Sequence, residues 1–174
     1  LQIDAFVLLK NSFGGSGYDI ACAQNDTPII YHLEKGNPIV EKVTFSPEFT
    51  SNVYFIYLNK KQSSKTAIAA YKRNNKNNLY QVIASNNQTT SEVLEANTIQ
   101  SFAEALEKHE LDMSVILETP TIKDALFPDF NGSIKSLGAW GGDFVMVISS
   151  ENPTEYFASK GYNTIIPYGE MILS

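Results

Sequence analysis

The sequence predicts an α+β fold in which an antiparallel sheet is covered by helices on one face. Three observations lead to this prediction. Strand-like segments lie in the first and last parts of the chain, a long helical block separates them, and turns with glycine or proline lie between the elements. The 174 residues are 43% hydrophobic and 18% charged, which is typical of a folded globular core and not of a disordered tail.

The first part of the chain predicts two short helices. Apolar residues at helical spacing predict a helix near residues 2–11, without a cap residue before it. A glycine cluster at 13–17 ends this pattern, and a second helix is expected over 18–24. A glycine-rich turn therefore leads directly into a short helix.

The rest of the chain alternates strands with helices. Residues 28–34 and 36–45 are typical of paired strands, with Gly36, Asn37 and Pro38 at the turn. The remaining elements are expected, in chain order, as a strand at 52–59, a helix from 63, helical segments over 79–117, a short helix after Pro120, a strand pair within 133–149, a helix at 151–161 and a strand at 163–168.

Composition argues against two classes of partner. The net charge of −6 and the pI near 4.9 argue against nucleic acid, because such binding rests on clustered Lys and Arg. The apolar runs, such as 144–148, are far shorter than the roughly 20 residues that cross a bilayer. We therefore expect neither a nucleic-acid partner nor a membrane span.

Cysteine and histidine are rare in this chain. The single cysteine, Cys22, fits a reducing cytoplasm and is expected to be a small buried residue. His32 is expected in a strand and His109 near a helix end, so the three residues suggest no zinc-type ligand set. A metal ion, if one is used, is expected to arrive with a ligand.

The amino terminus begins inside an amphipathic pattern. Leu1 is not an initiator methionine, and the segment that follows has helical spacing at once. We therefore expect that a preceding segment belongs to the natural protein. An exposed hydrophobic patch on the first helix is then expected, since the missing part would cover it.

Two glycine clusters are candidate ligand-binding turns, one at 13–17 and one at 138–142. Glycine accepts positive φ and lets the backbone approach a ligand, so such turns can present N–H groups to an anion. The alternative for each cluster alone is a tight turn without a ligand. If both serve one site, the two segments must border the same cleft.

A carboxylate follows each cluster. Asp19 lies in the first turn of the second expected helix and is a candidate base that orients a hydroxyl; the alternative is that it only satisfies helix N–H groups. Asp143 comes just before an apolar strand and is expected to brace the loop. The tyrosines of the strands, Tyr31 among them, are expected to pack in sheets.

The sequence resembles the GHMP kinase superfamily in these two segments. SGYDIACA, starting at Ser16, is similar to the Ser-Gly-x-Asp run that begins a helix and carries the family's catalytic aspartate. SIKSLGAWGGDFVMVI, starting at Ser133, is similar to the family's late Lys-x-x-Gly-Ala-Gly-Gly-Gly loop between strands. The string GYDIA, at 17–21, matches a bacterial GHMP-like subgroup letter for letter. The order and separation of the two motifs are more specific than either motif alone.

The resemblance implies a domain layout and roles for the motif residues. Residues 1–25 would end an amino-terminal domain, and residues 26–174 would form the carboxy-terminal, ferredoxin-like α+β domain. Asp19 would orient or deprotonate the acceptor hydroxyl of a mevalonate-like metabolite. The residues implied to contact the acceptor or the phosphates are Ser16, Gly17, Tyr18, Gly138, Ala139, Trp140, Gly141 and Gly142.

Two departures from the family pattern leave alternatives open. Trp140 replaces the middle glycine of the late loop, and the family's ATP loop, Pro-x-x-x-Gly-x-Gly-Ser-Ser, does not occur in the chain. ATP and Mg²⁺ would then be held mainly by a preceding half, and this chain alone would be inactive. The alternatives are a noncatalytic binding or regulatory protein on the GHMP scaffold and a stand-alone α+β ligand-binding domain.

Overall fold

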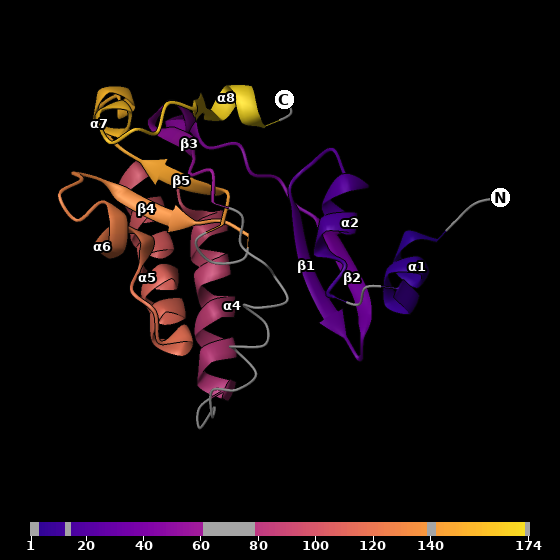
Figure 1. Cartoon of the computed structure of the whole chain (residues 1–174). Helices are drawn as coiled ribbons and strands as arrows, with labels where there is room; N and C mark the ends of the chain where they lie inside the picture. Colours follow the sequence, from indigo (N-terminus) through magenta and orange to yellow (C-terminus); the bar gives the residue numbers. More distant parts are fainter. Residues whose placement is uncertain (1–3, 13–14, 61–78, 139–141, 173–174) are drawn as a thin grey trace. The chain divides into compact units, whose positions relative to one another are not determined.

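The computed structural model describes residues 4–12, 15–60, 79–138 and 142–172, which form two compact units (Figure 1). The first unit ends at Ser46 and the second begins at Pro47. This division lies further along the chain than residue 25, because the hairpin after residue 26 contacts the helix before it. The assignment of 1–25 to an amino-terminal domain stays a prediction.

The first unit contains α1 (Ala5–Ser12) and α2 (Tyr18–Ala23), followed by a two-stranded sheet. Asp4 caps α1, since its carboxylate accepts hydrogen bonds from the backbone N–H groups of Phe6 at 2.9 Å and Val7 at 3.2 Å. Both predicted helices are present. The cap shows that α1 begins later than the predicted residue 2.

The hairpin pairs β1 (Ile29–Glu34) with β2 (Asn37–Lys42) in antiparallel register. Its turn is Lys35–Gly36, and both residues have positive φ, 50° and 82°, as a type I′ turn requires. The turn therefore lies one residue before the predicted one. Pro38 is tolerated within β2 because it sits beside the pair that closes the turn, where its nitrogen points away from β1.

The second unit is built on a four-stranded antiparallel sheet in the order β4-β5-β3-β6. Its strands are β3 (Val53–Tyr57), β4 (Ser133–Ser136), β5 (Phe144–Ile148) and β6 (Ile165–Pro167). In chain order the unit is strand, helices, two strands, helix and strand, and the first and third strands lie at the centre. This is the ferredoxin-like topology that the resemblance to GHMP kinases implies.

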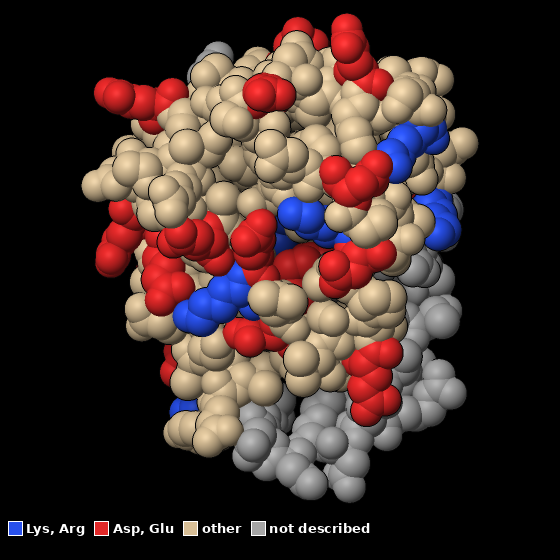
Figure 2. Space-filling view, turned by 90° about the vertical axis from the view of Figure 1, so that its left-hand side faces the viewer, with Lys and Arg blue, Asp and Glu red and all other residues tan. Residues whose placement is uncertain are grey.

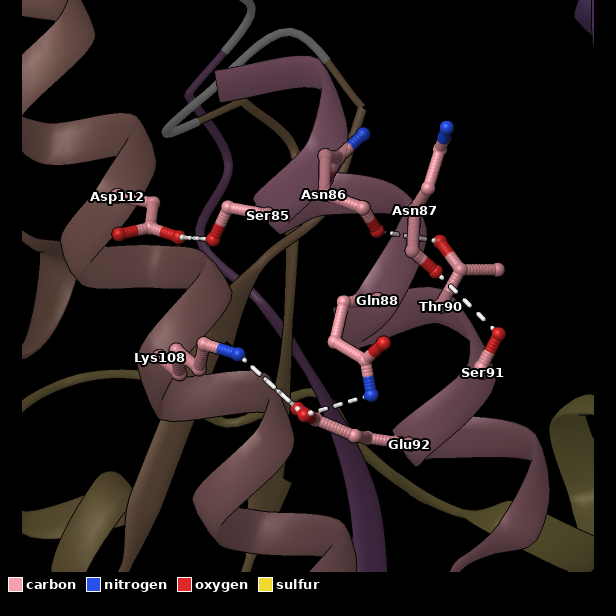
Figure 3. Close-up of polar contacts among 9 residues, drawn as sticks. All are labelled: Ser85, Asn86, Asn87, Gln88, Thr90, Ser91, Glu92, Lys108 and Asp112. Carbon is pink, nitrogen blue, oxygen red and sulfur yellow. Dashed lines mark hydrogen bonds and ion pairs between the residues drawn. The ribbon is translucent and has the colours of Figure 1, made fainter. Parts of the chain in front are cut away.

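Helices connect and flank this sheet. Figure 1 shows α4 and α5 side by side, and a capping box at Thr98 begins α5. Polar contacts join the pair, including the Ser85 hydroxyl that donates to Asp112 at 2.7 Å (Figure 3). The helical elements are α4 (Leu79–Glu95), α5 (Ile99–Leu117), α6 (Ile122–Leu126), α7 (Thr154–Ser159), α8 (Tyr168–Met171) and the 3₁₀ turn η1 (Glu48–Asn52).

The core of the second unit is rich in aromatic rings. Phe127 and Phe157 are fully buried, with ring centroids 5.0 Å apart in an edge-to-face arrangement. β3 is buried on both faces, since the adjacent residues Phe55 and Ile56 are 4% and 0% exposed. Side chains on both faces of this central strand are therefore covered.

We expect Phe157→Ala to lower the free energy of unfolding by about 3–5 kcal/mol, because it leaves a cavity among packed rings. Tyr80→Ala on α4 is the matched control. Tyr80 is 90% exposed, so its truncation should change stability by less than about 0.5 kcal/mol. Chemical denaturation followed by circular dichroism measures both, and equal losses would contradict the assigned core.

Candidate functional site

The turn before α2 depends on a glycine at one position. Gly17 is buried, has φ +81° and forms the N-cap of α2. A Cβ at this residue would lie 2.9 Å from two ring carbons of Phe6 in α1. Both the backbone conformation and the packing therefore favour glycine here.

Ser16 is held in place by two contacts. Its carbonyl accepts a hydrogen bond from the Tyr31 hydroxyl of β1, and its Oγ accepts one from the Tyr18 backbone N–H at 3.3 Å. The first contact links residues 15 positions apart. Sequence reasoning missed this role of Tyr31, since it predicted only packing within a sheet.

Asp19 lies in the first turn of α2, as predicted, and its side chain is exposed. Among the described residues, no hydrogen bond or ion pair occupies its carboxylate. Burial raises the pKa of Tyr31, and the negative charge of Asp19 raises it further. The first turn of α2 suits a carboxylate that stabilises the helix N-terminus as well as one that meets a substrate, so the role of Asp19 as a base stays a prediction.

Tyr18 and Cys22 lie one helical turn apart on α2. The pKa of Tyr18 is raised to about 12, mainly by hydrogen bonding to the Cys22 sulfur and secondly by partial burial. The Tyr18 ring meets that of Tyr31 edge to face, with centroids 5.7 Å apart. Cys22 is exposed, so the prediction of a buried cysteine is wrong: the short α2 turns this residue outward and buries Ala21 instead.

A cavity of about 480 Å³ lies beside Ser16 in the first unit. Its walls come from α1, from the turn before α2 and from the tip of the hairpin. The residues that line it are Asp4, Phe6, Val7, Leu9, Gly15, Ser16, Leu33, Gly36, Asn37 and Pro38. Ser16 is therefore the predicted acceptor-binding residue that borders a described cavity.

The late glycine segment joins β4 to β5. Gly138 is exposed with φ +67°, whereas Gly142 is buried. The segment is fixed at its far end by the Leu58 N–H, which donates to the Asp143 carbonyl at 2.7 Å. The predicted site residues Ala139, Trp140 and Gly141 lie outside the described residues.

The predicted brace, in which the Asp143 side chain bonds to amides of the loop, stays a prediction. The side chain is exposed and makes no hydrogen bond or ion pair with another described residue. The two glycine segments belong to different compact units. That they border one cleft stays a prediction.

His109 lies in the middle of α5, not near a helix end as predicted. It is half-buried. Its pKa is lowered mainly by burial and secondly by the positive charge of Lys135. Within the described part of the chain its Nδ1 has no partner, and no three His, Cys, Asp or Glu side chains lie close enough to hold a metal ion. The described donor set therefore does not form a metal centre.

The charged and apolar side chains at the surface relate to the predictions about nucleic acid, a covering segment and the membrane. On the face shown in Figure 2, Lys and Arg side chains lie among Asp and Glu side chains. Val7 and Leu8 of α1 are 54% and 56% exposed, as the sequence predicts for this helix. None of the helices in the described ranges combines the length and apolar character needed to cross a membrane.

We expect Gly17→Ala to destabilise the chain more than Gly36→Ala. Both residues have nearly the same positive φ, so each substitution should cost about 1–2 kcal/mol in backbone strain. Only Gly17 also places the new methyl group against Phe6, which should add about 1–3 kcal/mol. Chemical denaturation measures the difference, and equal losses would contradict the close packing of α1 against this turn.

We expect Asp19→Asn to lower the pKa of Tyr31, because the substitution removes a negative charge that opposes phenolate formation. Burial still acts, so part of the upward shift should remain. Nuclear magnetic resonance titration with ¹³C-labelled tyrosine measures this pKa. Asp26→Asn is the control. If the pKa of Tyr31 falls equally in both variants, Asp19 lies too far from the Tyr31 hydroxyl to act on it specifically.

Comparisons with known proteins bear on the fold. No protein-family model matches the chain, and a search of curated proteins finds no match. Among solved structures, the crystal structure of L. major mevalonate kinase in complex with R-mevalonate is similar, with a TM-score of 0.63 and 12% identity. The similarity covers 87% of this chain and 50% of the kinase chain. The chain therefore has a GHMP kinase-like fold that spans half the length of that mevalonate kinase.

Proposed function

We propose that this chain forms the acceptor side of an ATP-dependent small-molecule kinase of the GHMP superfamily. Its fold resembles half of a mevalonate kinase, and the segment beginning at Ser16 resembles the superfamily's catalytic motif. The observation that carries the proposal is the carboxylate of Asp19, which is exposed in the first turn of α2 and has no hydrogen-bond or ion-pair partner among the described residues. A carboxylate in this state is available to a substrate.

Asp19 would accept the proton of the acceptor's hydroxyl group. The hydroxyl oxygen forms a bond to the γ-phosphorus of ATP while the bond from that phosphorus to the β,γ-bridging oxygen breaks, and ADP leaves. Phosphoryl transfer depends mainly on positioning and charge stabilisation. The fixed turn at Ser16 and Gly17 supplies positioning on the acceptor side, with Tyr18 beside it.

The late segment would contribute backbone N–H groups near the phosphates or the acceptor, from Gly138, Gly142 and the residues between them. ATP and Mg²⁺ would be bound mainly by a half that precedes this chain. Among the described residues, no three His, Cys, Asp or Glu side chains lie close enough together to hold a metal ion. Residues 1–25 would complete that preceding domain.

The proposed class of acceptor is taken from the resemblance to mevalonate kinase. A mevalonate-like hydroxylated or phosphorylated metabolite is the proposed acceptor, and the cytoplasm is the proposed compartment. The net charge of −6 supports a partner other than nucleic acid. Fold likeness does not fix the substrate, so the acceptor must be found by assay.

In the full-length protein, we expect Asp19→Asn to lower kcat by about 10²- to 10⁴-fold while the KM for ATP changes little. The reason is that the variant loses the proton acceptor, whereas the triphosphate is held elsewhere. An ATP-consumption screen against small alcohols and phosphate esters measures both constants. Asp26→Asn, another exposed aspartate of the first unit, should keep wild-type activity. Equal activity in the wild type and the Asp19→Asn variant would remove the catalytic role.

A noncatalytic binding or regulatory protein on the same scaffold is the second candidate. The sequence favours it at one position, where Trp140 stands in place of a loop glycine. The same screen separates the two candidates. Binding of a metabolite without ATP consumption, in a full-length protein whose phosphate loop is altered, would favour this second function.

A further inference from the structure

An edge strand leads into the late glycine segment. β4 is the outer strand of the sheet and pairs only with β5 within the described structure. The Leu137 N–H donates to the Phe144 carbonyl at 3.2 Å, so the neighbouring residue Ser136 turns its own N–H and carbonyl away from β5. These two backbone groups need partners from elsewhere.

A buried ion pair supplies these partners. Glu110 of α5 accepts hydrogen bonds from the Ser136 N–H at 3.2 Å and the Ser136 hydroxyl at 2.9 Å. Lys135 donates to the Ser136 carbonyl at 2.6 Å and pairs with the same Glu110 carboxylate at 3.0 Å. The side chains of Glu110 and Lys135 are only 7% and 12% exposed. Every polar group of Ser136 is thus held by one charge pair.

The three donors converge on one carboxylate oxygen, Oε2 of Glu110. A buried carboxylate is costly unless it is paired and hydrogen-bonded, and here both conditions are met. Lys135 is also the lysine of the late motif. Its ammonium group is occupied by Glu110 and by the Ser136 carbonyl.

We infer that Glu110 is a positioning residue that sets where the late glycine segment leaves the sheet. Ser136 is the last residue of β4, and Gly138 follows two positions later. Asp143 fixes the other end through Leu58, so the segment is anchored on both sides. This inference rests on the proposed function for its consequence in catalysis, but the anchoring itself does not require that function.

A link of similar kind lies at the other end of β4. Glu107, also on α5, accepts a hydrogen bond from the Ser133 hydroxyl at 2.6 Å. It joins the same helix to the same strand but at the end away from the glycine segment. Glu107 therefore provides a control for any general effect of loosening α5 from the sheet.

Trp140 is the only tryptophan of the chain and lies within the glycine segment, so its fluorescence reports on that segment alone. The test variant combines Glu110→Met with Lys135→Met. Replacing both members of a buried pair by apolar residues is often neutral for stability, so the fold should persist. Acrylamide quenching of Trp140 should rise in this variant and remain at the wild-type level in Glu107→Met.

Activity of the full-length protein gives a second readout. In the paired variant, kcat should fall by up to about 10²-fold, as expected when reacting groups are misplaced by about 1 Å. The KM for ATP should change little. The two readouts are separable. If the wild type shows no kinase activity but Trp140 quenching still rises in the paired variant, the anchoring is supported and only the proposed function is overturned.

Two results would overturn the inference. One is unchanged Trp140 quenching in the folded paired variant, and the other is an equal rise in Glu107→Met. If the paired variant fails to fold, Ser136→Ala decides the question, since it removes the hydroxyl contact to Glu110 but keeps the ion pair. Quenching that stays at the wild-type level in Ser136→Ala would then count against the anchoring role.

Discussion

The second unit depends on β3, a strand with neighbours on both edges and buried side chains on both faces. β3 pairs with β5 and β6, which are contributed by residues far along the chain. Because the central strand comes first in this unit, its partners must return to it after the helices and the glycine segment have been passed. The contact from the Leu58 N–H to the Asp143 carbonyl ties the end of that segment to the residue that follows β3.

Sequence patterns predicted most of the described elements in their order, whereas the ferredoxin-like topology was implied by the resemblance to GHMP kinases. The predicted helix from residue 63 lies outside the described residues, and the short η1 and α8 were not predicted. Alternating and helical apolar patterns are local features of the sequence, and the described strands and helices lie where these patterns occur. The hairpin turn was displaced by one residue because the turn type depends on φ. Lys35 adopts a positive φ, which its residue type does not predict. His109 was misplaced because α5 continues well beyond it, to Leu117.

The candidate site was predictable only in part. Gly17 and Asp19 stand out because a glycine turn that enters a helix is a local signal. Tyr31 and Glu110 were not identified, since each acts on a residue at least 15 positions away, and one sequence carries no sign of such pairing. Cys22 was placed wrongly because a helix of six residues is too short for periodicity to tell its faces apart.

Both outer strands of the four-stranded sheet are unsuited to adding another strand. At β4, the outward backbone groups of Ser136 are already occupied by Glu110 and Lys135. At the other border, β6 has three residues and ends in Pro167, which has no N–H to offer. A protein that docks on this unit therefore has little to gain from backbone pairing. Recognition by side chains, and resistance of this sheet to edge-to-edge aggregation, follow from the same two edges.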